Sequence, residues 1–381
     1  MIPIARPNLG EEEASAAREV ILSGWVSQGP KVGEFEKAFA DFVGAPHACA
    51  VSNCAAALHL ALLTVGVKPG AAVATVSHSF IATANAVRHC GSEPVFVDID
   101  PGTLNMSPEA LKKCLEKNPG KITAVLVVHQ IGMPADIASI VSIAREFDIP
   151  VVEDAACAAG SEISLDGGRT FEKIGKPHGD IACFSFHPRK ILTTGEGGMI
   201  TTRSKEYDTE CRLLRGQAMS VPALDRHQAD RIILETYSKV GYNYRMSDIP
   251  AAVGIEQLKK LPEMVRRRRE IAERYREGLK DLLWLGLPVE PPYARTNWQS
   301  FAVRLLPGAP RQQKDFMQYL LDNGVVTRPG IMNAHQEPPY AGQKVSLKHS
   351  EEARARNVLL PIFSAMSDEN VETVIEVIRH A

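Results

Sequence analysis

The sequence lacks any long apolar run and any recognisable export signal. No window of the 381 residues approaches the roughly 20 apolar residues that a membrane-spanning helix needs. The first residues, Met1-Ile-Pro-Ile-Ala-Arg6, contain no basic region followed by an apolar stretch, which is the pattern of a secretory signal. These absences predict a cytoplasmic protein.

An excess of charge and a cysteine framework are also missing. The 43 basic residues nearly balance the 45 acidic ones, so the net charge of -2 offers no field for a polyanion, and we expect no nucleic-acid or membrane partner. The seven cysteines are odd in number and form no C-x-x-C pair. Together with the absence of H-E-x-x-H and of a carboxylate-rich calcium loop, this predicts reduced thiols and no metal site.

The common nucleotide-binding motifs are absent as well. No G-x-G-x-x-G follows a predicted strand, and Gly175-Lys176 is followed by Pro177 without the upstream glycine of a P-loop. Binding of a dinucleotide or of a nucleoside triphosphate through these motifs is therefore excluded.

What the sequence does contain is an alternation of short β-rich runs and helical patterns from residue 48 to residue 202. This alternation predicts an α/β protein, whose large domain has a mostly parallel seven-stranded sheet flanked by helices. The expected strands are Ala48–Ser52, Ala72–Ser77, Pro94–Asp100, Ile122–Gln130, Pro150–Ala155, Asp180–His187 and Gly198–Thr202. Expected helices between them include Ala55–Val65, Pro108–Asn118 and Asp136–Phe147.

A change of composition predicts a domain boundary near residue 280. Two helical segments, 247–261 and 262–280, lead into a stretch that contains Pro288, Pro291 and Pro292. We therefore assign residues 1–280 to the large domain and residues 281–381 to a smaller α+β domain. For the smaller domain we expect a strand at 300–306, a helix at 311–323, a short strand near Val325, an irregular loop at 328–340 and two terminal helices.

Asp154 and Lys190 are candidate catalytic residues because Asp154 lies at the carboxyl end of a predicted strand and Lys190 follows another. Ligands of a doubly wound sheet bind at the carboxyl ends of its strands. A partly desolvated carboxylate at Asp154 could hold a cationic heterocycle, although the same residue could cap a following helical turn. Lys190 precedes a glycine-rich turn and, if burial and positive neighbours lower its pKa, could form an imine; alone it could equally be an inert surface lysine.

Three further features would complete a phosphate and ring site. The helix that begins after Ser52 offers free backbone amides to an anion, although Ser52 or Asn53 could simply cap it. Ser185 could donate its hydroxyl to the same phosphate. Phe80 follows a strand and could cover a flat ring, or it could pack in the core.

Taken together, these segments resemble the DegT/StrS family of sugar aminotransferases, which have the aspartate-aminotransferase fold, over nearly the whole chain. The segments that carry the resemblance, in the order of the family, are Gly24–Pro30, Ser52–Leu62, Phe80–Asn85, Val152–Ala156, Phe184–Lys190, Gly195–Gly198 and Gly241–Met246.

The resemblance implies pyridoxal 5'-phosphate as the cofactor and gives each motif a role. Lys190 would hold the cofactor as an imine and then move the proton, Asp154 would pair with the pyridinium nitrogen, and Phe80 would stack on the ring. The residues implied to hold the phosphate are Asn53, Cys54 and Ser185.

The resemblance also implies contacts outside the catalytic group. Asn243 would reach the phosphate of the neighbouring subunit, which predicts a homodimer with shared active sites. Arg245, Arg328 and His335 are lesser candidates for contacting the substrate.

Two positions depart from the family. The family usually has threonine at the position of Cys54, where the side chain contacts the phosphate, and often glutamine at that of Cys157, where it contacts the phenolic oxygen of the ring. A thiol forms weaker hydrogen bonds, which puts both contacts in doubt.

We therefore expect an enzyme that moves an amino group from glutamate to a keto carbon of a nucleotide-linked deoxysugar in polysaccharide biosynthesis. The residues 241–252 resemble the branch that acts at carbon four more than the branch that acts at carbon three. One alternative is a sugar dehydratase that uses the same cofactor, but that branch has histidine in place of Lys190. The other is a non-catalytic regulatory protein that only binds ligand, for which the loss of Lys190 or Asp154 would be expected.

Overall fold

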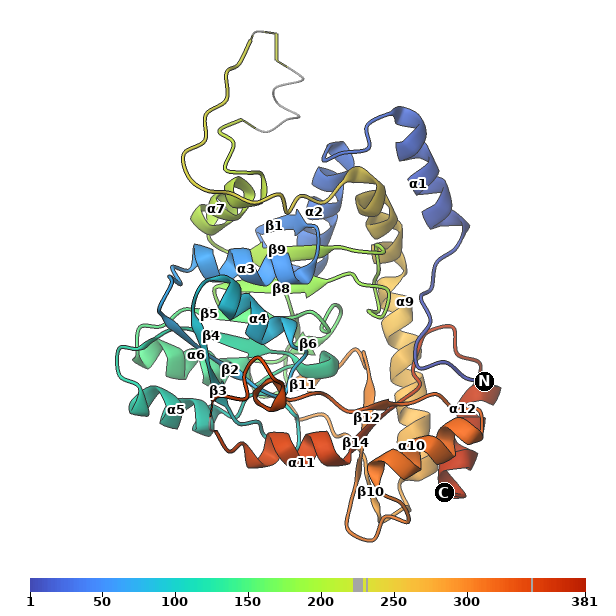
Figure 1. Ribbon diagram of the computed structural model, residues 1–381. Helices are drawn as coiled ribbons and strands as arrows, with labels where there is room; N and C mark the ends of the chain where they lie inside the picture. Colours follow the sequence, from blue (N-terminus) through green and yellow to red (C-terminus); the bar gives the residue numbers. More distant parts are fainter. Residues whose placement is uncertain (222–228, 231, 344) are drawn as a thin grey trace.

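The computed structural model describes residues 1–221, 229–230, 232–343 and 345–381 (Figure 1). Its large sheet has seven strands in the order β1-β9-β8-β5-β4-β2-β3. β9 runs antiparallel to both of its neighbours and the other pairs are parallel, so the prediction of a mostly parallel seven-stranded sheet is confirmed. The strands are β1 (His47–Val51), β2 (Ala72–Val76), β3 (Glu93–Val97), β4 (Ile122–Val128), β5 (Val151–Asp154), β8 (Ile181–Ser185) and β9 (Gly198–Thr202).

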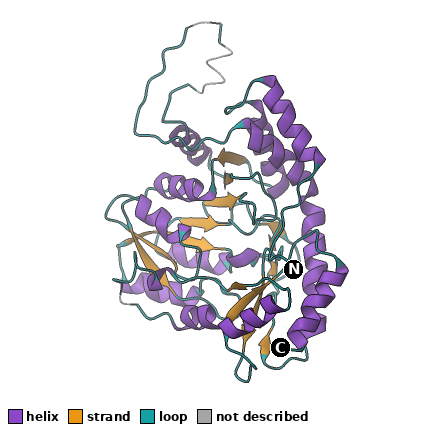
Figure 2. Ribbon diagram, turned by 45° about the vertical axis from the view of Figure 1, so that its right-hand side comes forward, coloured by secondary structure: helices purple, strands orange, loops and turns teal. Residues whose placement is uncertain are grey.

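Helices cover both faces of this sheet (Figure 2). Along β4, Ala124 and Leu126 face one hydrophobic cluster, while Val125 and Val127 face another, because successive side chains of a strand point to opposite faces. This burial on both sides explains why the strand is apolar along most of its length. The helices of the large domain are α1 (Glu11–Ser23), α2 (Pro30–Val43), α3 (Cys54–Thr64), α4 (Ala82–His89), α5 (Pro108–Lys117), α6 (Ile137–Glu146) and α7 (Lys205–Arg215).

The long helix α9 (Asp248–Leu279) joins the two parts of the molecule. The sequence predicted two helices that meet at Pro262, but the structure has one helix of 32 residues with that proline inside it. Proline removes a single backbone hydrogen bond, and the burial of Leu261, Met264 and Val265 beside it opposes a break. Within the described ranges no helix, α9 included, is both long and apolar enough to cross a membrane.

A second core underlies the small sheet β10-β12-β14-β13. The expected strand and helix are present as β12 (Phe301–Leu305) and α10 (Gln313–Asp322), and two terminal helices follow as α11 (Lys348–Arg356) and α12 (Asp368–Arg379). The strand expected near Val325 is wrong in position: Val325 makes only an isolated bridge to Ile2, and β13 is Arg328–Pro329. The remaining strands of this small sheet are β10 (Leu285–Gly286) and β14 (Asn357–Leu360). A third sheet consists of β11 (Ala294–Arg295), β6 (Glu162–Ile163) and β7 (Glu172–Lys173).

The second core is not made only of residues beyond 280. It takes in Ile2 from the amino terminus and Ile271, Tyr275 and Leu279 from the last turns of α9. The boundary at residue 280 stays a prediction, since no separate unit has been delimited.

Candidate active site

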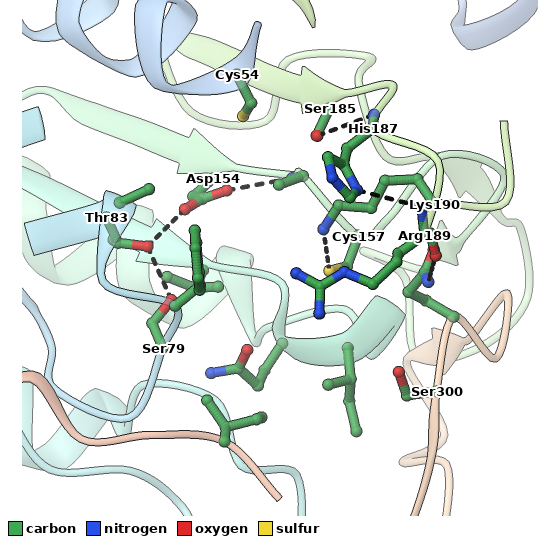
Figure 3. Close-up of a pocket in the computed structure, with 18 of the residues that line it drawn as sticks. Cys54, Ser79, Thr83, Asp154, Cys157, Ser185, His187, Arg189, Lys190 and Ser300 are labelled. Carbon is green, nitrogen blue, oxygen red and sulfur yellow. Dashed lines mark hydrogen bonds between the residues drawn. The ribbon is translucent and has the colours of Figure 1, made fainter. Parts of the chain in front are cut away.

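A cavity of about 470 Å³ opens at the carboxyl ends of the parallel strands, and residues of β13, β14 and the loop after β13 also line it. Parallel strands leave their carboxyl ends at one edge of the sheet, which is where such folds bind ligands. Figure 3 shows how side chains from β5, β8 and the loops after them face this space. The sequence-predicted residues that line it are Asn53, Cys54, Phe80, Asp154, Cys157, Ser185, Lys190 and Arg328.

Asp154 is the last residue of β5 and is buried at 4% exposure. Thr83 Oγ1 donates a hydrogen bond to Asp154 Oδ2 at 2.8 Å, and the Ala156 amide donates to Oδ1 at 3.2 Å. Burial raises the pKa of Asp154, although these two hydrogen bonds and the charge of Lys190 act in the opposite direction. Through the Ala156 amide Asp154 also caps the turn that follows β5, and the residue lines the pocket, so the two roles that the sequence left as alternatives are compatible.

Lys190 follows β8 and the turn His187-Pro188-Arg189, and its Nζ lies 3.0 Å from Cys157 Sγ. Burial lowers the pKa of Lys190, but Cys157, which accepts its hydrogen bond, and the carboxylate of Asp154 favour the ammonium and hold its pKa above the usual value. The expectation of a lowered pKa is therefore wrong for the protein chain alone. The expectation assumed positive neighbours, whereas the neighbours that raise the pKa are a thiol, Cys157, and a carboxylate, Asp154.

The start of α3 provides an anion site. Asn53 caps the helix, since its Oδ1 accepts the Ala56 amide at 2.9 Å and its carbonyl oxygen accepts the Ala57 amide at 3.1 Å. The amides of Cys54 and Ala55 have no partner in the part of the chain that the structure describes. The sequence left capping and anion binding as alternatives. Asn53 caps the helix, and the amides of the next two residues remain available to an anion.

Close packing brings this helix end to the sheet. A Cβ atom on Gly198, the first residue of β9, would lie 2.7 Å from the carbonyl group of Asn53, so only glycine allows this approach. Burial raises the pKa of Cys54 well above its usual value, which leaves a neutral thiol beside the free amides. The backbone rather than the side chain of Cys54 is therefore the stronger group for a phosphate.

These groups fit pyridoxal phosphate. The free amides of α3 and the Ser185 hydroxyl suit a phosphate, a buried carboxylate suits a protonated ring nitrogen, and Lys190 supplies an amine in the same cavity. Phe80 is 63% exposed although it is a large apolar residue. Core packing is therefore excluded for Phe80, and its ring is free to cover a flat ligand.

Sequence reasoning missed three residues of this site. Thr83 orients Asp154, and it could have been noticed because it falls three residues after Phe80 in a motif already singled out. His129 follows β4, the strand next to β5. Its Nδ1 accepts a hydrogen bond from the Ala135 amide at 3.0 Å, so the ring proton lies on Nε2. Nε2 in turn donates to the Glu153 carboxylate at 2.9 Å. Arg189 also lines the pocket, and it could have been noticed because it directly precedes Lys190 in the sequence.

Three predicted contacts are not brought to this chain's pocket. His335 is buried at 8% exposure, and its Nδ1 lies 2.6 Å from Ser77 Oγ. Asn243 and Arg245 form isolated bridges to Gly216 and Val51, and neither lines the cavity. Their predicted roles toward the substrate or a second subunit stay predictions.

Comparison with known proteins shows the family of this chain. The sequence model described as the DegT/DnrJ/EryC1/StrS aminotransferase family matches residues 7–379. The chain belongs to this family. One similar protein is the spore coat polysaccharide biosynthesis protein SpsC of Bacillus subtilis. It is 35% identical over 99% of this chain and 96% of its own length.

Solved structures of the family share the fold over the whole chain. The aminotransferase TlmJ from Streptoalloteichus hindustanus is 36% identical and has a TM-score of 0.89, with 100% of this chain and 98% of TlmJ covered. The sugar aminotransferase CalS13 from Micromonospora echinospora is 26% identical, also with a TM-score of 0.89 and 100% of both chains covered. The predicted aminotransferase fold is thereby confirmed.

Proposed function

We propose that the protein is a pyridoxal-phosphate-dependent aminotransferase that moves an amino group from glutamate to the keto carbon of a nucleotide-linked deoxysugar. The observation that carries the proposal is the meeting of an amine, a buried carboxylate and a helix end with two free amides in one cavity. The similarity to the sugar aminotransferase CalS13 and to the spore coat polysaccharide biosynthesis protein SpsC supports a sugar as the acceptor.

The bound cofactor would supply an electron sink for the carbon that loses or gains the amino group. Asp154 would hold the ring nitrogen in its protonated form, since a cation beside a buried carboxylate favours ionisation of both groups. The amides of Cys54 and Ala55, with Ser185, would anchor the phosphate, and Phe80 would exclude water from one face of the ring.

Lys190 would carry the proton. Its Nζ is the amine that faces the cavity beside Cys157, so it can take a proton from one carbon and return it to another within reach of its side chain. Both halves of the transfer use the same cavity, and one lysine therefore serves the donor and the acceptor. A dehydratase of the same family would be expected to carry histidine at this position.

We also propose that two chains share their sites. The segment that precedes Asn243 exposes Ile232, Leu234 and Val240 at 93%, 85% and 84%. Apolar residues gathered on an exposed segment favour contact with another protein surface. A second copy docked there would bring Asn243 of the partner subunit to the phosphate.

Carbon four is the proposed site of amination, on the resemblance of residues 241–252, and the cytoplasm remains the expected location. Screening keto nucleotide-sugars that differ in the position of the carbonyl group, with glutamate as donor, tests the first point. The mass and the position of the new amine in the product decide between carbon three and carbon four.

The test of the proposed function is spectroscopic. The purified protein should show a band at about 410 to 430 nm that collapses when glutamate is added. A dehydratase would form product without consuming glutamate, and a regulatory protein would show no turnover. Absence of the band in protein supplied with the cofactor would overturn the proposal.

A further inference from the structure

Two arginine side chains, Arg189 and Arg328, line the cavity and are exposed to it. Neither forms an ion pair or a side-chain hydrogen bond with another part of the described chain. An unpaired guanidinium inside a ligand cavity is available for an anion, because the planar group presents paired donors that match a carboxylate.

The backbone at Arg189 is held by the same contacts that hold Lys190. The Arg189 carbonyl oxygen accepts a hydrogen bond from Gln299 Nε2 at 2.7 Å, and Gln299 Oε1 accepts the Ile191 amide at 3.1 Å. One glutamine amide therefore spans Lys190 and ties the residues on both sides of it. The backbone at Arg189 is therefore held next to Lys190, so its side chain starts beside the amine that must reach the reacting carbon.

Arg189 is separate from the phosphate site. In the view of Figure 3 its guanidinium lies on the other side of Lys190 from Cys54 and Ser185. In this view Arg189 is set apart from the labelled residues of the phosphate site, which leaves its guanidinium for a second anion. Arg328 belongs to β13 in the small sheet and has no such link to Lys190.

An amino-acid donor carries a carboxylate on the very carbon from which the amino group leaves. Lys190 must reach that carbon, so the carboxylate has to lie close to the lysine and away from the phosphate. We propose that Arg189 binds the α-carboxylate of the amino donor and so makes the cavity selective for α-amino acids. This inference rests on the proposed aminotransferase function and adds a donor-recognition residue to it.

The experiment compares Arg189→Gln, Arg189→Lys and the matched control Arg203→Gln in the holoenzyme. Arg203 is an exposed arginine after β9 that does not line the cavity. Rapid mixing with glutamate, followed by the cofactor band, gives the half-saturating glutamate concentration. Loss of a charge-assisted pair should raise it on the order of 10- to 100-fold in Arg189→Gln, less in Arg189→Lys, and not in Arg203→Gln.

A second donor identifies which carboxylate is bound. 4-Aminobutyrate has a distal carboxylate but none on the carbon that bears the amine. Wild type should prefer glutamate, and Arg189→Gln should lose most of that preference, while the half-reaction of the aminated enzyme with the keto sugar keeps its rate. An equal loss with both donors, or a loss in the keto-sugar half-reaction as large as that with glutamate, would overturn the inference.

The outcomes also separate this inference from the proposed function. If wild type shows no cofactor band, the aminotransferase proposal fails. If wild type reacts with glutamate and Arg189→Gln reacts equally well, the proposed function stands and the role of Arg189 is wrong.

Discussion

The Nζ of Lys190 donates a hydrogen bond to the Sγ of Cys157 at 3.0 Å. Burial alone would lower the pKa of this lysine, and the thiol is the first of the groups that reverse the effect. The residue that departs from the family's usual glutamine therefore touches the amine on which the chemistry depends. Cys157 therefore favours the charged form of Lys190.

Cys157→Ala should lower the pKa of Lys190. Removing a group that stabilises the ammonium makes the free amine available at a lower pH, so the pH dependence of cofactor uptake by the cofactor-free protein should move to lower pH. The growth of the band after addition of the cofactor at a series of pH values measures this shift. Cys114→Ala changes a thiol on α5 outside the cavity and serves as the control; an unchanged profile in Cys157→Ala would contradict the effect.

Lys190→Ala should abolish both the visible band and amino transfer, because no other residue lining the cavity carries an amine. Absorbance and product mass measure the two losses. Circular dichroism should remain that of wild type, since the side chain lines the cavity and belongs to no helix or strand. A band that persists in this variant would show that the assignment of the lysine is wrong.

Thr83→Val should slow the reaction through Asp154. The threonine hydroxyl donates to Asp154 Oδ2 at 2.8 Å, and without it the pKa of the buried carboxyl rises further. Loss of one hydrogen bond to a charged group costs about 1.5 kcal/mol, which corresponds to roughly a tenfold lower rate. Ser79→Ala is the matched control, because Ser79 contacts Thr83 Oγ1 at 2.8 Å but has no hydrogen bond to Asp154.

The parts of this site that could be predicted from the sequence are those in which the residues at or just after one strand end are recognisable by themselves. Asp154 ends an apolar strand, and Lys190 lies between a strand and a glycine-rich turn. The start of α3 was recognisable for the same reason, since Ser52 and Asn53 separate a strand from an alanine-rich helix. In each case a few consecutive residues determine both the backbone and the chemistry.

What could not be predicted depends on partners far apart in the chain. Thr83 and Asp154 are 71 positions apart, and Ser77 and His335, whose contact keeps His335 out of the cavity, are 258 apart. The prediction of a lowered pKa for Lys190 was wrong for the same reason, because the direction of the pKa shift depends on which groups surround Nζ. In the small sheet β14 pairs with both β12 and β13, yet its four residues are too short to show an alternating pattern.

Glu36 on α2 is expected to stabilise the fold through a buried charge network that the sequence did not reveal. Its carboxylate accepts hydrogen bonds from Arg215 Nη1 at 2.5 Å, Arg212 Nη1 at 2.7 Å and the Ala50 amide at 2.9 Å. Glu36→Gln removes the charge and leaves Arg215, which is 4% exposed, without its main counter-charge. The free energy of unfolding at pH 7, measured with urea, should fall by about 3 to 5 kcal/mol.

The same network gives a pH dependence of defined sign. Burial raises the pKa of Glu36, but Arg215 and Arg212 outweigh it, so the pKa in the folded protein lies below the usual value. The stabilisation is therefore complete above about pH 4.3, the pKa of an unfolded glutamate, and is lost as the pH falls through the lower pKa of the folded state. The difference in unfolding free energy between wild type and Glu36→Gln should shrink over that range. Glu263→Gln, which alters an exposed ion pair with Arg266, is the control and should change the unfolding free energy little at any pH. A difference that stays constant down to the lowest pH at which both proteins fold would show that the charge of Glu36 does not supply the stability.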